Sequence, residues 1–192
     1  MGKGFASVAL FGLLLCGRGW SQQADVVSAR LAAQPAPQGA FSLKISGSMY
    51  VPVAEAARSF GMGAGEDLTL GYQIPGTMFF GFGGISYTFA PAQLAAPTVF
   101  FAAAELGFGM RFRITSHVDV RVYGTAGYWY GAYSDMSTSS TDPYAGAGVE
   151  LQLALTPALG LGVDAQYKNY FGLWQGLAAG FGMRIALESG ER

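Results

Sequence analysis

The sequence is poor in the side chains from which enzyme and metal sites are usually built. It contains one cysteine and one histidine, and only 12% of its residues are charged, against about 25% in an ordinary soluble domain. The formal net charge of -1 provides no basic surface for nucleic acid, which is excluded as a partner. The chain holds instead 51% hydrophobic residues and 29 glycines, a composition that does not suit a water-exposed surface.

The first 21 residues have the pattern of a secretory signal peptide. Lys3 precedes an apolar run from Phe5 to Leu15, which is too short to span a bilayer as a helix of ~20 residues. Small residues before position 22 predict cleavage after Ser21. Lipidation of Cys16 is the alternative, and it is disfavoured because Leu15 stands where a lipobox has a small residue. Cleavage would remove the single cysteine, so we expect no disulfide in the exported chain.

Residues 41–187 are predicted to form eight β-strands. Apolar and polar residues alternate in successive segments such as LGLGVDAQYKNYF, at 159–171, and this period of two is typical of a strand with one apolar face. The expected strands are 41–52, 61–74, 77–90, 98–114, 118–132, 144–155, 159–171 and 175–187.

The connections between these strands alternate in length. Tight ones are expected at 74–77, 115–117 and 156–158, and longer or more polar ones at 53–60, 91–97, 134–143 and 172–174. In the first tight connection, Pro75 and Gly76 suit the two central positions of a type II turn. Alternating lengths predict an even-stranded up-and-down barrel, with its tight turns at one membrane face and its loops at the other.

A helical membrane protein is a weaker alternative. No charged residue occurs between Asp67 and Glu105, so a hydropathy scan would propose a transmembrane helix there. Three prolines and several glycines interrupt that segment, and they leave no window of ~20 residues that suits a spanning helix.

The two faces of the predicted strands differ in charge. The polar face carries six positive and five negative side chains among glycine, serine and alanine: Lys44, Asp67, Glu105, Arg111, Arg113, Asp119, Arg121, Glu150, Asp164, Lys168 and Arg184. This near-neutral mixture fits a narrow barrel interior in which charges must pair. A soluble lipocalin-like barrel would turn the apolar face inward, leaving a glycine-rich, lysine-poor outside. We therefore predict an all-β, eight-stranded antiparallel transmembrane β-barrel with the apolar face toward lipid.

Aromatic residues lie on the apolar face near strand ends, where the interfaces of a bilayer place aromatic girdles; they include Tyr72, Tyr87, Phe89, Tyr128 and Tyr130. Two residues interrupt the pattern. Glu66 falls on the apolar phase, which requires a bulge or a point where the strand leaves the bilayer. Asn169 is also on the apolar phase, and it marks the point where the 159–171 strand is expected to leave the bilayer.

The segment Phe41–Leu187 resembles the small outer-membrane barrels of the OmpA, OmpX and OmpW type, and is similar to short spirochaetal members of that group. The resemblance rests on a glycine-punctuated first hairpin, GSMYVPVAEAARSFGMGAGEDLTLGYQI, and a last strand, GFGMRIAL. In that strand Gly182, Ile185 and Leu187 match the spacing of the signal read by the outer-membrane assembly machinery. The family usually ends on an aromatic residue, whereas here ESGER follows Leu187.

The resemblance implies a location in the bacterial outer membrane, with outer-membrane lipid and the assembly machinery as partners. Residues 22–40 are then a periplasmic leader, 41–187 the barrel and 188–192 a C-terminal tail. The polar loops are candidates for binding an extracellular ligand.

An outer-leaflet lipid-modifying enzyme is the least favoured function. Such chemistry commonly needs a histidine beside a serine or carboxylate, and His117 lies in a predicted turn. No cluster has metal-ligand spacing, so neither a metal nor a cofactor is expected. Gly160, Gly162 and Ala165 match a dinucleotide-binding pattern, but they lie inside a strand and open no helix.

Two non-enzymatic functions remain. In the leading hypothesis the lumen is filled by side chains, the charges are structural, and the barrel has a structural or surface-interaction role. The charges could alternatively form a selectivity element for solutes. The main alternative, which the OmpW resemblance implies, is a channel for small hydrophobic molecules, with Phe80, Phe82, Tyr123 and Trp129 as candidate lining residues if their side chains point inward.

Overall fold

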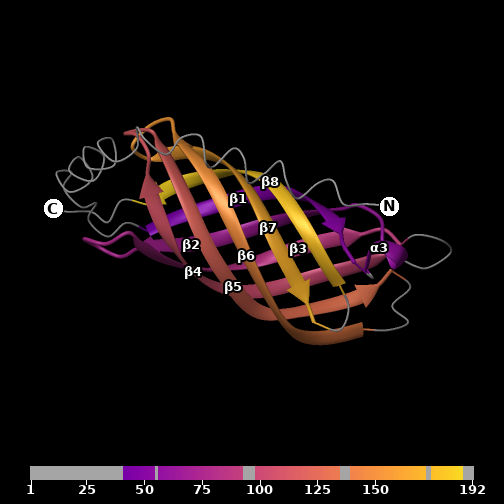
Figure 1. Ribbon diagram of the computed structural model, residues 1–192. Helices are drawn as coiled ribbons and strands as arrows, with labels where there is room; N and C mark the ends of the chain where they lie inside the picture. The colour runs from indigo at the N-terminus through magenta and orange to yellow at the C-terminus, as the bar shows by residue number, and fades with distance from the viewer. Residues whose placement is uncertain (1–40, 55, 93–97, 135–138, 172–173, 188–192) are drawn as a thin grey trace, which may run out of the picture. The chain divides into compact units, whose positions relative to one another are not determined.

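Eight antiparallel strands close into an up-and-down barrel in which each strand pairs with the next and β8 pairs with β1 (Figure 1). The computed structural model describes residues 41–54, 56–92, 98–134, 139–171 and 174–187. The strands are β1 (Phe41–Pro52), β2 (Gly63–Gln73), β3 (Phe79–Ala90), β4 (Val99–Arg113), β5 (Val118–Tyr133), β6 (Ser139–Ala154), β7 (Leu159–Tyr170) and β8 (Trp174–Leu187). The predicted fold class is confirmed.

Several expectations concern residues outside the described ranges. They are the signal peptide at 1–21 with Cys16, the leader at 22–40, the tail at 188–192, and parts of the connections at 53–60, 91–97, 134–143 and 172–174.

Three short turns connect strands at one end of the barrel, which we call the tight-turn end. Between β2 and β3, Gly76 has a φ of 69° and the Thr77 amide donates to the Ile74 carbonyl at 3.3 Å, as expected for a type II turn. In the turns between β4 and β5 and between β6 and β7, a threonine hydroxyl accepts hydrogen bonds from backbone amides in addition to the backbone pairs. Thr115 Oγ1 accepts hydrogen bonds from the backbone amides of His117 and Val118. Thr156 Oγ1 accepts hydrogen bonds from the backbone amides of Ala158 and Leu159.

The opposite end, here called the loop end, differs from the sequence prediction in two places. β6 begins at Ser139 rather than at 144, because Ser139–Pro143 pairs with the far end of β5, where Trp129 lies opposite Asp142. The connection expected at 134–143 is therefore shorter than predicted. A one-turn helix, α3 (Ala56–Ser59), lies within the connection expected to be a loop at 53–60.

Side chains alternate strictly between the lumen and the outer wall. In β1 the lumen-facing Lys44, Ser46 and Ser48 are buried, while Ile45 and Met49 on the opposite face are exposed. The outer wall is mostly apolar, and Leu106 at the centre of β4 is 74% exposed. Among the described residues, no helix has the length and apolar character that a bilayer span requires.

Glu66 stays on the outer wall without any bulge. The ladder is continuous through it, with Glu66 opposite Gly47 of β1 and Tyr87 of β3. A bulge, one of the two explanations predicted for its position, is therefore wrong. Glu66 is the fourth residue of β2 from the loop end, which is consistent with the other explanation, that β2 leaves the bilayer there.

Candidate functional site in the barrel lumen

All eleven charged residues predicted to face the lumen lie on the lumen side of their strands. Nine of them are buried, and Arg111 and Arg113, at the tight-turn end, are half-buried. Within the described strands they form three groups along the barrel axis rather than one continuous network. The strands tilt around the barrel, as Figure 1 shows, so side chains far apart in sequence meet inside it.

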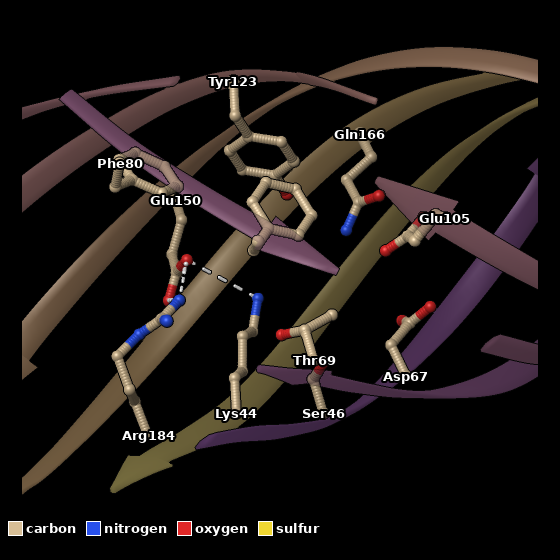
Figure 2. A pocket seen from close by; sticks show the side chains of 11 residues that line it. Lys44, Ser46, Asp67, Thr69, Phe80, Glu105, Tyr123, Glu150, Gln166 and Arg184 are labelled. Atoms are coloured by element: carbon tan, nitrogen blue, oxygen red, sulfur yellow. Dashed lines mark hydrogen bonds and ion pairs between the residues drawn. The ribbon is translucent and has the colours of Figure 1, made fainter. Parts of the chain in front are cut away.

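The central group pairs two basic side chains with two carboxylates. Arg184 Nη2 donates to both carboxylate oxygens of Glu150, at 2.8 and 3.2 Å. Lys44 Nζ lies 3.6 Å from Glu150 Oε2 and 3.4 Å from Asp164 Oδ1, and Gln166 donates to Asp164 at 2.6 Å. Figure 2 shows Lys44 and Arg184 both directed toward Glu150. This mutual pairing offsets the cost of burying four charges.

A second group lies nearer the loop end and centres on Lys168, which is 1% exposed. Its Nζ lies 3.2 Å from Asp67 Oδ1 and 3.9 Å from Glu105 Oε2. It also donates to Tyr50 Oη at 3.4 Å, while the Tyr144 hydroxyl donates to Glu105. The Lys168 ammonium group therefore lies within 4 Å of two carboxylates. The hydroxyls of Tyr50 and Tyr144 form further hydrogen bonds in this group.

The third group lies at the tight-turn end. Asp119 is bound by Arg111, at 2.5 Å between Nη2 and Oδ2, and by Arg113, at 3.5 Å between Nε and Oδ1. Arg121 lies deeper, and its guanidinium carbon is 5.1 Å from the centroid of the Phe80 ring. No side-chain hydrogen bond or ion pair joins Arg121 to another described residue, and its Nε is buried without a partner.

The four aromatic residues predicted as possible lining all point into the lumen. Phe80 stacks on Phe82 at 6.0 Å between ring centroids, and Phe82 meets Tyr123 edge-on at 5.5 Å. Trp129 is 1% exposed and lies nearer the loop end. The phase of β3, which the sequence left open, thus turns Phe80 and Phe82 inward.

Sequence reasoning missed the aromatic cluster that surrounds Trp129. Tyr170 stacks on Phe101 and Tyr144, with centroids 5.5 and 5.1 Å apart, and Trp129 meets Tyr170 edge-on at 6.0 Å. Tyr50, Phe101, Trp129, Tyr144 and Tyr170 are all at most 1% exposed. The sequence signal that could have identified this cluster is the position of these aromatic residues on the polar, lumen-facing phase of their strands. The cluster fills the loop end of the lumen.

Little open space remains in the middle of the lumen. A cavity of about 30 Å³ lies between the central and loop-end groups, lined by Lys44, Asp67, Phe80, Phe82, Tyr123 and Glu150 among others. Since a water needs ~10–15 Å³ of such volume, this cavity has room for two or three waters at most. Side chains therefore occupy most of the middle of the lumen.

The two other kinds of site considered from the sequence are a catalytic histidine and a metal site. His117 is exposed in the turn between β4 and β5, where its backbone amide donates to Thr115 Oγ1. Across the ranges that the structure describes, no three His, Cys, Asp or Glu side chains are arranged to hold a metal ion.

A closed ladder of eight antiparallel strands, an apolar outer wall and a charged lumen define the class of small up-and-down β-barrels of outer-membrane proteins. Solved structures with this fold include that of Neisserial surface protein A, with a TM-score of 0.55 and 15% identity, over 79% of this chain and 99% of that one. Ail, the attachment invasion locus protein of Yersinia pestis, has a TM-score of 0.51 and 14% identity, over 78% of this chain and 97% of that one.

No protein-family model matches the sequence, and no curated protein matches it either. At identities this low the likeness is one of fold. The resemblance to small eight-stranded outer-membrane barrels, drawn above from the sequence, is confirmed at that level.

Proposed function

We propose that the protein is an integral outer-membrane barrel with a side-chain-filled, non-conducting lumen and a structural or surface-interaction role. The single observation that carries this proposal is the combination of an apolar outer wall with a lumen closed by paired charges and stacked aromatic rings. In water, such a wall would expose large aliphatic and aromatic side chains on every strand, which favours aggregation. In a bilayer it faces hydrocarbon.

The filling of the lumen supports a structural barrel over a channel. The aromatic cluster occupies the loop end, and the central charges are joined by contacts of 2.8–3.6 Å. A central cavity of about 30 Å³ has no room for a hydrophobic solute. The loops at the loop end are then the parts of the chain available to an extracellular ligand, and Ail, named for attachment and invasion, provides a precedent for such a role on this fold.

The conductance of the purified protein in a planar lipid bilayer tests the lumen. We expect no reproducible single-channel steps and no uptake of small solutes by liposomes that contain the folded barrel. A larger barrel porin reconstituted in the same way serves as the positive control. Reproducible conductance or uptake would contradict the filled-lumen proposal.

Cysteine labelling in intact cells tests the membrane location and orientation. Arg58→Cys places a thiol on exposed α3 at the loop end, and Ser116→Cys places one in an exposed tight turn. With a membrane-impermeant maleimide we expect labelling of the first variant in intact cells, and of the second only after the outer membrane is permeabilised. Equal labelling of both variants in intact cells, or recovery of the chain in a detergent-free soluble fraction, would contradict the proposed insertion.

A further inference from the structure

The tight-turn end of the lumen contains a pocket of about 240 Å³ whose lining is rich in guanidinium groups. Arg111 and Arg113 come from the end of β4, and Arg121 comes from the start of β5. Asp119 and Gln152 also line the pocket. The volume lies below the ~300–1,000 Å³ of pockets for drug-sized ligands, so a small ligand fits it best.

Basic side chains outnumber acidic ones among the described residues that line this pocket. Arg111 and Arg113 both bind Asp119, and the described lining includes no second carboxylate. Arg184 also lines the pocket, but its charge is matched by Glu150 at 2.8 Å. Among the described lining residues, three guanidinium groups therefore face one carboxylate, and Arg121 forms no ion pair with it.

The register places two of these like charges side by side. Arg121 lies directly opposite Arg111 on the neighbouring strand, where side chains on one face have Cβ atoms ~4.5–5.5 Å apart and like charges destabilise the sheet. Arg121 is also opposite Glu150 on β6. The carboxylate of Glu150, however, is bound by Arg184 and Lys44, and no described carboxylate lies within 4 Å of the Arg121 guanidinium to form an ion pair.

The environment of Arg121 leaves its donors available for a ligand. One face of the guanidinium lies over the Phe80 ring, a contact that holds the plane without using its N–H groups. The Nε atoms of Arg111 and Arg121 are both buried without a hydrogen-bond partner. Buried donors without partners are uncommon in folded proteins and call for an explanation.

We propose that this pocket, lined by Arg111, Arg113 and Arg121, binds one phosphate-class anion. A phosphate oxyanion accepts paired hydrogen bonds from planar guanidinium groups, and the buried Arg121 guanidinium at the deeper end has donors available for it. The exposed fraction of the Arg113 side chain, 30%, exceeds that of Arg111, 19%, so the ligand enters past Arg113 and reaches Arg121 at the deeper end. The anion is either free phosphate or the phosphate of a small organic monoester.

Titration calorimetry of the folded barrel in a phosphate-free, non-ionic detergent tests the proposal. Inorganic phosphate and glycerol 3-phosphate are titrated separately at constant ionic strength in sodium chloride. We expect one phosphate per barrel. Binding of glycerol 3-phosphate with similar affinity would assign the site to phosphate monoesters, and binding of inorganic phosphate alone would assign it to the free anion.

Arg121→Gln is the decisive variant, because it removes the central guanidinium and also relieves repulsion with Arg111. We expect phosphate affinity to fall by about tenfold or more, the loss typical of a charge-assisted hydrogen bond. Arg58→Gln, on exposed α3, removes one positive charge at the other end and should leave the affinity unchanged. Heat-modifiable gel mobility confirms folding of each variant, and Arg111→Gln replaces Arg121→Gln if the latter does not fold.

Three results would overturn the proposal. They are no phosphate binding above the chloride background, the same affinity in the wild type and the pocket variant, or an equal loss in Arg58→Gln. None of these results depends on whether the barrel conducts. Failure of the phosphate-site proposal can therefore be distinguished from failure of the filled-lumen proposal.

Discussion

Arg184 of β8 donates hydrogen bonds to both carboxylate oxygens of Glu150 of β6, at 2.8 and 3.2 Å, although β7 lies between the two strands. This contact joins strands that share no backbone hydrogen bonds. It is therefore the curvature of a closed barrel, rather than strand pairing, that brings the two side chains together. The same curvature brings Lys168 to Asp67 across 101 residues of sequence.

Loss of the Glu150 charge should destabilise the barrel strongly. Glu150→Gln leaves Arg184 and Lys44 buried with less compensating charge, and removing one partner of a buried ion pair costs about 3–5 kcal/mol. Urea unfolding from lipid vesicles, followed by tryptophan fluorescence, measures the free energy of unfolding. Glu66→Gln is the matched control, since this carboxylate is exposed on the outer wall, and its effect should be within about 0.5 kcal/mol. Equal effects would show that the central pairs are dispensable.

Truncation of Trp129 should be far more costly than truncation of its neighbour Tyr128. Trp129 is 1% exposed inside the aromatic cluster, whereas Tyr128 is 68% exposed on the outer wall. Trp129→Ala should lower the free energy of unfolding by about 3–5 kcal/mol, because it leaves a cavity among packed rings. Tyr128→Ala should cost clearly less in the same vesicle assay, read by circular dichroism. A reversed order would mean that the assigned phase of β5 is wrong.

A charge on the outer wall tests which solvent that wall meets. Leu106 is the central residue of β4 and faces outward, so Leu106→Arg should cost about 2–4 kcal/mol in a bilayer, as expected for arginine near the midplane. Ser116→Arg, in an exposed tight turn, should change stability little. Folding yield into vesicles and the free energy of unfolding report both variants. A tolerated Leu106→Arg would contradict the assignment of the wall to lipid.

Gly107 should resist substitution because an aromatic ring lies over it. Phe82 is its cross-strand partner, and a Cβ on Gly107 would overlap that ring. Gly107→Ala should therefore cost about 1–3 kcal/mol through displacement of Phe82. At Gly81, by contrast, the nearest atom to an added Cβ is the Gly107 carbonyl oxygen at 3.8 Å, an ordinary contact. Gly81→Ala should be tolerated in the same unfolding experiment, and similar costs for both variants would argue against the ring contact.

The strands and their facing follow from local sequence to a large extent. Alternation with a period of two assigns each side chain to one of two faces, and Pro75–Gly76 specifies a turn through backbone geometry alone. Neither signal depends on distant residues. Where local signals were weak, prediction failed: Ser139–Pro143 has little strand character, yet its pairing with the far end of β5 makes it part of β6. Tertiary pairing overrides propensity in such a segment.

The sequence by itself determined the barrel class, the eleven charges on the polar face and the low charge of the apolar face. It did not determine which charges pair, because partners depend on strand register, tilt and closure. Only the tertiary structure decided that Glu150 binds Arg184 and Lys44 rather than Arg121, which lies directly opposite it on β5. That choice fills the centre of the lumen with neutralised pairs and leaves one guanidinium group available at the tight-turn end.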